Sequence, residues 1–232
     1  MFKRIFFAVS ALILCFLPLR AMQSDTYLID TPTAEVLPLR DLSVRTRIFT
    51  GGGVLAYFDF TVINRLSIGA SLTAEHLVGE SDEDIKLLVP ALQLKYRLYD
   101  GGEHLPALAI GFDNQGFKYN HDLDEYEQPA KGLYLAFSKE ILIPGLLFNP
   151  GLNVTVDGFE FDKLAGYVSA AYNIKDIVNL MFEWDNIHGI KESRLNGGLR
   201  LYITENFSLD FAVRNFNHKA ERIAQFKYSC SI

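Results

Sequence analysis

Apolar and polar side chains alternate along much of this chain, most plainly between residues 90 and 112. The apolar positions there are Leu92, Leu94, Tyr96 and Leu98, and the polar positions between them are Gln93, Lys95 and Arg97. Successive side chains of a β-strand point to opposite faces, so this pattern predicts a strand with one apolar and one polar, basic face. Asp100-Gly101-Gly102 can form a tight reversal, and an apolar stretch of strand length follows. The segment therefore predicts a β-hairpin.

Units of this kind recur to the end of the chain and predict about twelve strands, with bounds uncertain by a few residues. The predicted strands are 42–49, 54–62, 66–77, 87–99, 104–112, 131–141, 146–157, 163–174, 178–186, 193–203, 207–215 and 222–230.

The connections between these strands alternate between tight and open. The tight connections are 63–65, 100–103, 142–145, 175–177 and 204–206, and the open ones include 78–86, 113–130, 158–162, 187–192 and 216–221. Only the first connection, 50–53, departs from this rule by being short. In an up-and-down meander, alternate connections lie at opposite ends, and bacterial outer-membrane barrels combine short periplasmic turns with longer external loops. Residues 41–232 are therefore predicted to form an all-β domain, an antiparallel up-and-down transmembrane β-barrel of about 12 strands (10–14).

The first 40 residues carry a different pattern. Lys3 and Arg4 precede an apolar run over 5–17, and Ala21 is a plausible cleavage residue, so residues 1–21 are predicted to be a secretory signal peptide. Residues 22–40 contain Pro32 and Pro38. They are expected to form an extended N-terminal segment that leads into the barrel from the periplasmic side.

Charge and cysteine content limit the possible partners. The whole chain has a formal net charge of -6, and cleavage after residue 21 removes three basic residues, which leaves -9. An acidic chain argues against a nucleic-acid partner. Cleavage also removes Cys15 and leaves Cys230 as the single cysteine, so no internal disulfide framework is expected.

Alternation by itself does not say which face points outward. In a water-soluble periplasmic barrel the apolar face would line a cavity for an apolar ligand, and this alternative stays open. The predicted signal peptide, the Gly, Ser, Ala and Asn residues of the polar face and the many aromatic residues near strand ends favour a membrane barrel. Those aromatic residues are Phe49, Tyr99, Phe112, Trp184, Tyr202, Phe207, Phe216 and Tyr228.

Several segments resemble uncharacterised bacterial outer-membrane β-barrel proteins: 31–37 (TPTAEVL), 51–53 (GGG) and 105–116 (LPALAIGFDNQG). Segments 183–187 (EWDNI) and 196–200 (NGGLR) are loosely similar to exopolysaccharide-associated outer-membrane barrels. The resemblance implies the outer membrane of a Gram-negative bacterium, with outer-membrane lipid and the outer-membrane assembly machinery as partners. It supplies no active-site residues.

If the apolar faces contact lipid, a set of charged side chains points into the lumen. This set comprises Arg45, Arg47, Asp59, Glu75, Lys95, Arg97, Asp157, Glu183, Asp185, Arg194, Arg200 and Arg214. Buried charges must be paired and hydrogen-bonded, so mixed signs predict a lumen braced by ion pairs. The alternative is a charged constriction that selects solutes.

The sequence offers little evidence for catalysis or cofactor binding. None of the five histidines stands at metal-ligand spacing with another, and no Gly-x-Ser-x-Gly signature is present. The acidic run 121–127 lacks the spacing of an EF-hand loop. No catalytic, cofactor or metal residue is predicted. The expected function is structural, solute passage, or accessory to polysaccharide export, with a small solute or a polysaccharide as ligand; the alternative is a membrane-embedded, lipid-active hydrolase.

Overall fold

The computed structural model describes residues 25–79, 84–157 and 160–232, apart from the side chain of Asp157. The predicted signal peptide lies outside the described residues.

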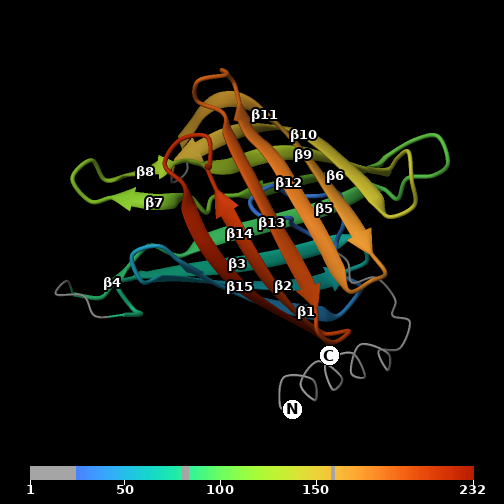
Figure 1. The fold of residues 1–232 in the computed structure, drawn as a ribbon, viewed down its shortest axis with the longest axis horizontal. Coiled ribbons are helices and arrows are strands. Elements are labelled where there is room, and N and C mark those ends of the chain that lie inside the picture. The colour runs from blue at the N-terminus through green and yellow to red at the C-terminus, as the bar shows by residue number, and fades with distance from the viewer. Residues whose placement is uncertain (1–24, 80–83, 158–159) are drawn as a thin grey trace, which may run out of the picture.

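Twelve strands of the described chain form a closed antiparallel barrel (Figure 1). They are β1 (Asp41–Phe49), β2 (Gly53–Ile63), β3 (Leu66–Glu75), β5 (Ala91–Tyr99), β6 (Ala107–Asp113), β9 (Ala130–Glu140), β10 (Leu146–Asp157), β11 (Glu160–Ile174), β12 (Val178–Ile187), β13 (Arg194–Tyr202), β14 (Phe207–Arg214) and β15 (Glu221–Ser231). Each strand pairs with its neighbours in chain order, and β15 pairs with β1 from Asp41↔Ser231 to Phe49↔Ile223, which closes the ring. The predicted fold class is confirmed.

The structure differs from the predicted strand bounds mainly beside prolines and inside the long connections. β5 and β6 begin directly after Pro90 and Pro106, three or four residues later than predicted, because proline cannot donate to a strand ladder. The connection after β3 contains the short strand β4 (Lys86–Leu87). The connection after β6 folds as a separate hairpin of β7 (Phe117–Asn120) and β8 (Glu125–Gln128), which projects from one end of the barrel (Figure 1).

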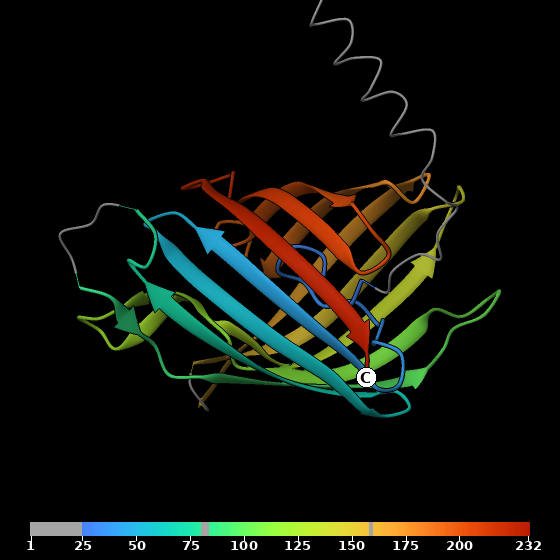
Figure 2. The ribbon, with the colours of Figure 1, turned by 90° about the horizontal axis from the view of Figure 1, so that it is seen from below.

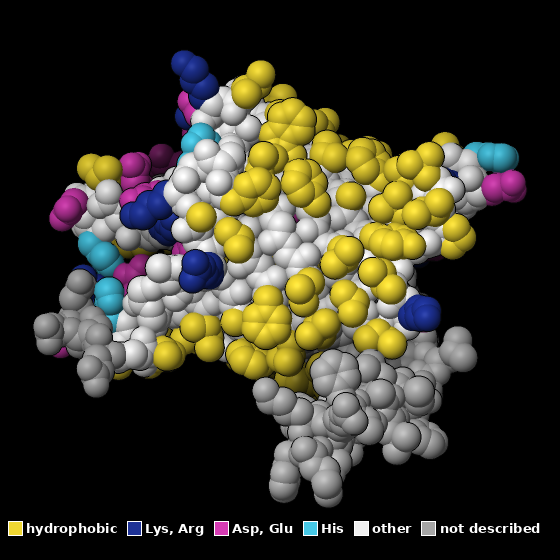
Figure 3. Space-filling view, viewed as in Figure 1, with side chains coloured by type: hydrophobic (Ala, Val, Ile, Leu, Met, Phe, Trp, Pro, Cys, Tyr) yellow, Lys and Arg dark blue, Asp and Glu magenta, His cyan; other side chains and the backbone are white. Residues whose placement is uncertain are grey.

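Apolar side chains cover the outside of the barrel and polar side chains fill its inside. On β5, Leu92 and Leu94 are 54% and 46% exposed, whereas Gln93 and Lys95 are 6% and 5% exposed. Hydrophobic side chains spread over the wall strands, and charged side chains gather mainly beyond them (Figure 3). This arrangement is that of a transmembrane barrel, and it contradicts the water-soluble alternative, in which the apolar face would point inward. In the described residues no helix is long and apolar enough to cross a membrane.

The two ends of the barrel differ in their connections. The tight turns lie at one end together with residues 38–40 and the C-terminus. In the three-residue β11–β12 turn, Lys175 and Asp176 both have φ of 54°, and Ile177 N donates to Ile174 O at 3.1 Å, so both central residues of this tight turn are left-handed, as in a type I′ turn. The open connections, with the β7–β8 hairpin, lie at the opposite end (Figure 1).

Two glycines in the wall make room for tyrosines inside the barrel. A Cβ added to Gly151 of β10 would lie 2.1 Å from Cζ of Tyr167, and one on Gly111 of β6 would lie 2.3 Å from the Tyr134 ring. Tyr134 and Tyr167 are almost fully buried. A bulky ring on one strand thus covers a bare glycine on the next, which is a known way of pinning strand register.

Candidate functional site: the lumen and its N-terminal hairpin

Residues 25–37 fold back into the barrel as a hairpin, which we call the lumen hairpin (dark blue in Figure 2). Its two arms are held by backbone hydrogen bonds from Leu28 N to Thr31 O (3.1 Å) and from Thr33 N to Thr26 O (3.1 Å). Its turn lies at 28–31, and both arms lead towards the end of the barrel that carries the tight turns. The sequence predicted an extended segment that leads into the barrel from the periplasmic side. In the structure residues 25–34 instead lie inside the barrel, and all of them are buried.

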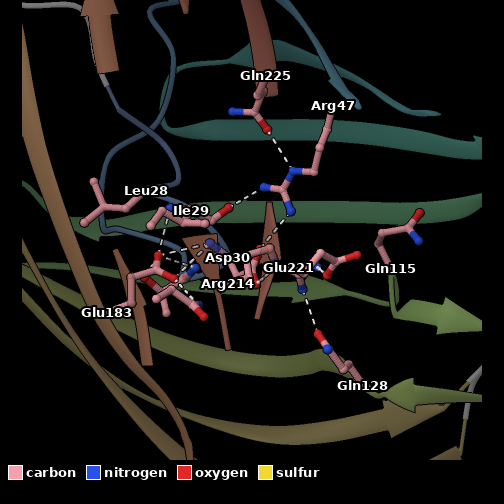
Figure 4. A network of polar contacts seen from close by, with 12 residues as sticks. Leu28, Ile29, Asp30, Arg47, Gln115, Gln128, Glu183, Arg214, Glu221 and Gln225 are labelled. Carbon is pink, nitrogen blue, oxygen red and sulfur yellow. Dashed lines mark hydrogen bonds and ion pairs between the residues drawn. The ribbon is translucent and has the colours of Figure 1, made fainter. Parts of the chain in front are cut away.

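Glu183 of β12 binds the turn of the lumen hairpin (Figure 4). Its Oε1 accepts hydrogen bonds from the backbone N atoms of Ile29 (2.8 Å), Asp30 (3.0 Å) and Thr31 (2.9 Å), and from the Thr31 hydroxyl (2.7 Å). Its Oε2 accepts one from Asn196 Nδ2 (2.8 Å). A buried carboxylate is costly without such partners. Glu183 therefore ties the turn to the wall through amide and hydroxyl donors.

Asp30, at the tip of the hairpin, lies between two arginines of the wall (Figure 4). Arg47 Nη1 of β1 is 2.8 Å from Asp30 Oδ1, and Arg214 Nε of β14 is 2.6 Å from Asp30 Oδ2. Burial raises the pKa of the Asp30 carboxyl, but the guanidinium groups of Arg214 and Arg47 lower it by more, so its pKa lies below the usual value. Asp30 belongs to the hairpin rather than to a spanning strand, and it stays ionised at neutral pH.

Both arginines make further contacts that hold them in place. Arg47 donates to the Gln225 side chain (3.2 Å) and to Ile29 O (2.5 Å). Arg214 donates to Glu221 (2.7 Å) and to Gln128 (2.8 Å). The Phe117 ring, from β7, lies 4.1 Å from Arg214 Cζ and 5.3 Å from Arg47 Cζ. The β7–β8 hairpin thus covers the arginine pair from the open-loop end.

Asp25, at the start of the hairpin, has a second pair of basic partners. Arg200 Nη1 of β13 lies 2.5 Å and Lys227 Nζ of β15 lies 3.7 Å from its Oδ1. The Tyr202 hydroxyl donates to its Oδ2 at 2.5 Å. Arg200 also forms a bidentate pair with Asp210, with distances of 2.7 and 2.8 Å. Two carboxylates of the hairpin, Asp25 and Asp30, therefore each lie between two cations from different strands.

The arms of the hairpin are bound by strands on the other side of the barrel. Lys95 Nζ donates to Thr26 O (2.6 Å) and Glu35 O (3.3 Å). Tyr27 donates to Asp113 (3.1 Å), and Ser138 accepts from Ala34 N (2.9 Å). Two cavities beside the hairpin measure about 10 Å³ each, roughly the space of one water. The hairpin thus fills the lumen at this level.

The other predicted lumen residues lie as follows. Arg45 pairs with Asp59 (3.2 Å) and Arg97 pairs with Glu35 of the hairpin (2.8 Å). Asp185 contacts both Lys131 and Arg194. Near the open-loop end, Glu75 accepts a hydrogen bond from His121 Nε2 (2.7 Å). The side chain of Asp157 lies outside the described residues. Many of the ion pairs that cross the lumen connect the wall to the hairpin rather than one strand to another. A role of these residues in selecting solutes stays a prediction.

Several residues of this site were missed at the sequence level. They are Asp25, Asp30 and Glu35 of the hairpin and Lys131, Asp210, Glu221 and Lys227 of the wall. One available signal was charge. The predicted set holds seven basic and only five acidic residues, and because buried basic groups need acidic partners, further carboxylates had to lie in the lumen. Alternation along 207–215 was a second signal, because it places Asp210 on the polar face.

A wider cavity of about 460 Å³ lies at the open-loop end, between the β7–β8 hairpin and the later loops. Five basic residues line it, Lys118, Lys163, Lys191, Arg194 and Lys219, together with the carboxylates Glu127, Asp162 and Glu192. An adjoining cavity of about 360 Å³ shares Lys118, Glu127 and Lys219 with it. The lining of the wider cavity therefore holds more basic than acidic side chains, whereas the adjoining cavity has three of each. In the described part of the chain, no cluster of three or more His, Cys, Asp and Glu side chains could hold a metal ion.

Comparison with solved structures identifies the class of barrel. The chain is similar to the KdgM porin, with a TM-score of 0.55 and 11% identity over 81% of this chain and 98% of that chain. The same values hold for the KdgM porin in complex with disordered oligogalacturonate. The NanC porin matches with a TM-score of 0.46 and 9% identity over 82% of this chain and 100% of that one. The fold is therefore the closed 12-strand antiparallel barrel of small transmembrane porins.

No family model and no curated protein sequence matches the chain. The likeness to porins rests on the fold alone, and the resemblance to exopolysaccharide-associated barrels stays a prediction.

Proposed function

We propose that this protein is an outer-membrane barrel of a Gram-negative bacterium, exported by residues 1–21 as a signal peptide. In this proposal it passes a hydrophilic solute of the oligosaccharide class when the lumen hairpin withdraws, and it performs no catalysis. The observation that carries the proposal is the closed 12-strand barrel with an apolar exterior and a charged lumen. The KdgM porin, which shares this fold, has been solved in complex with an oligogalacturonate, which supports the solute class.

The lumen hairpin determines the state of such a channel. With residues 25–34 buried in the lumen, the hairpin occupies the path that a solute would take. The hairpin joins the wall covalently only through residues 38–40, at the end with the tight turns. It can therefore leave the lumen towards the periplasm without breaking the strand ladder.

Conductance of the purified protein across planar bilayers tests the proposal. Glu183→Ala leaves three backbone N–H groups of the turn without an acceptor, and each buried unsatisfied group costs about 1–3 kcal/mol. We expect wild-type protein to conduct rarely and Glu183→Ala to open often. Heat modifiability of the band on gels checks that each variant is a folded barrel.

A disulfide supplies the matched control. Ala34 N lies 2.9 Å from Ser138 Oγ, so Ala34→Cys with Ser138→Cys, in a Cys230→Ser background, can lock the hairpin to β9. Adding this lock to Glu183→Ala should abolish conductance, and a reductant should restore it. If folded Glu183→Ala never conducts, passage is wrong and a permanently plugged, structural barrel is the better description.

A further inference from the structure

The lumen hairpin presents a regular chemical pattern to the barrel wall. Two of its three carboxylates, Asp25 and Asp30, each lie between two cations: Arg200 and Lys227 for the first, Arg47 and Arg214 for the second. Between these positions its turn offers N–H and O–H donors to one carboxylate of the wall, Glu183.

Withdrawal of the hairpin would remove some of the partners of these wall groups, although Arg200 would keep Asp210 and Arg214 would keep Glu221. Asp30 is the carboxylate paired with Arg47, which donates otherwise to Gln225 and to Ile29 O. Lys95 would lose the two hairpin carbonyls that accept from it. Glu183 would keep Asn196 but lose the donors of the turn. A buried charge that has lost its partner is costly. The vacated lumen would therefore favour a solute that supplies carboxylates to the basic groups and hydrogen-bond donors to Glu183.

A linear oligosaccharide that bears carboxylates meets these requirements. Its carboxylates can replace those of Asp25 and Asp30, and its hydroxyl groups can donate to Glu183 in place of the hairpin turn. A neutral sugar could serve Glu183 but would leave Arg47 without a counter-charge. The guanidinium of Arg47 pairs with a carboxylate more strongly than with a neutral acceptor.

We propose that the lumen contains a binding site for a linear, carboxylate-bearing oligosaccharide, and that the lumen hairpin occupies this site as an internal mimic of it. The site comprises Arg47, Arg214, Arg200, Lys227 and Glu183. The inference rests on the proposed passage function and names its substrate class.

The experiment compares binding of hexagalacturonate and maltohexaose to the full-length protein in detergent, by calorimetry. The test variant is Asp25→Asn with Asp30→Asn, which keeps the shape of the hairpin but removes the competing carboxylates. We expect hexagalacturonate to bind this variant at least about tenfold more tightly than wild type, with maltohexaose binding weakly to both. Asp30→Asn alone serves if the double variant does not give a heat-modifiable barrel.

Two further variants separate competition from simple loosening. Thr33→Ala removes the hydroxyl that donates to Asp25 O (2.6 Å), so it loosens the hairpin while both carboxylates remain, and it should give little gain for either sugar. Adding Arg47→Gln and Arg214→Gln to the double variant should remove the gain for hexagalacturonate.

The outcomes distinguish this inference from the proposed function. Equal gains for the two sugars, or an equal gain in Thr33→Ala, would overturn the acidic-sugar site while conductance of Glu183→Ala still supports passage. Selective binding of hexagalacturonate together with a non-conducting Glu183→Ala would support the site and reject passage.

Discussion

Asp30 and Arg214 lie 184 positions apart in the chain, yet their side chains form an ion pair of 2.6 Å inside the barrel. Both side chains are 3% exposed. The pair joins the tip of the lumen hairpin to β14, whose neighbour β15 in turn pairs with β1. The hairpin therefore acts as a central brace as well as a plug.

The first prediction concerns this pair. Arg214→Met should leave the Asp30 carboxylate with Arg47 alone and lower the free energy of unfolding by about 3–5 kcal/mol. Asp30→Leu combined with Arg214→Met should cost less than the two single changes added together, because neither Asp30 nor Arg214 is then left buried without the other. The losses at Arg47 and Glu221 occur in the single changes as well. Urea unfolding in detergent, followed by the fluorescence of Trp184, the single tryptophan, measures these values. Strict additivity of the two changes would show that the residues do not interact.

The second prediction concerns movement of the hairpin. Leu28 is 1% exposed, so in a Cys230→Ser background Leu28→Cys should react slowly with a bulky, membrane-impermeant maleimide. Adding Glu183→Ala should raise the labelling rate several-fold, because the hairpin turn loses its acceptor. Glu192→Ala, which removes a carboxylate from an external loop, should leave the rate unchanged. Equal rates with and without Glu183→Ala would mean that Glu183 does not hold the hairpin.

The third prediction concerns the lipid-facing surface. Leu94, on the outer face of β5, is 46% exposed. Leu94→Arg places a charge against lipid and should cost about 2–4 kcal/mol near the middle of the bilayer. Leu105→Arg, in the turn after β5, should cost little. The measurement is the heat-modifiable fraction after refolding into liposomes, and equal fractions for the two variants would contradict a membrane-embedded β5.

The fourth prediction concerns Gly151 and the tyrosine that covers it. Because a Cβ at Gly151 would lie 2.1 Å from Tyr167 Cζ, Gly151→Val should displace the buried ring and lower the free energy of unfolding by about 1–3 kcal/mol. Gly189 has no neighbouring atom within 4 Å of such a Cβ, and Gly189→Val should be close to neutral. Comparison of the two melting temperatures tests this, and a Gly151→Val protein as stable as wild type would refute the packing role of the glycine.

Much of the fold could be predicted from local pattern. The alternation along β5 is enough to assign Leu94 to one face and Lys95 to the other, since side chains on a strand point alternately to opposite sides. The alternation of tight and open connections predicted which loops share an end of the barrel. The β7–β8 hairpin was missed because it lies inside a loop that is rich in charged residues.

The candidate site was much less predictable. Glu183 could be placed on the inner face from its position in a strand, but its partners Ile29, Asp30 and Thr31 lie more than 150 positions away. Nothing in the local pattern of residues 22–40 indicates that they fold back, since prolines favour an extended segment inside or outside a barrel.

The sequence by itself therefore determined most of the strands, their order and which side chains share a face, because these depend on a period of two residues and on short turns. Only the tertiary structure decided that the lumen is filled. The charges of Arg47, Arg200 and Arg214 needed buried partners, and closing the ring is what brought Asp25 and Asp30 within reach of all of them.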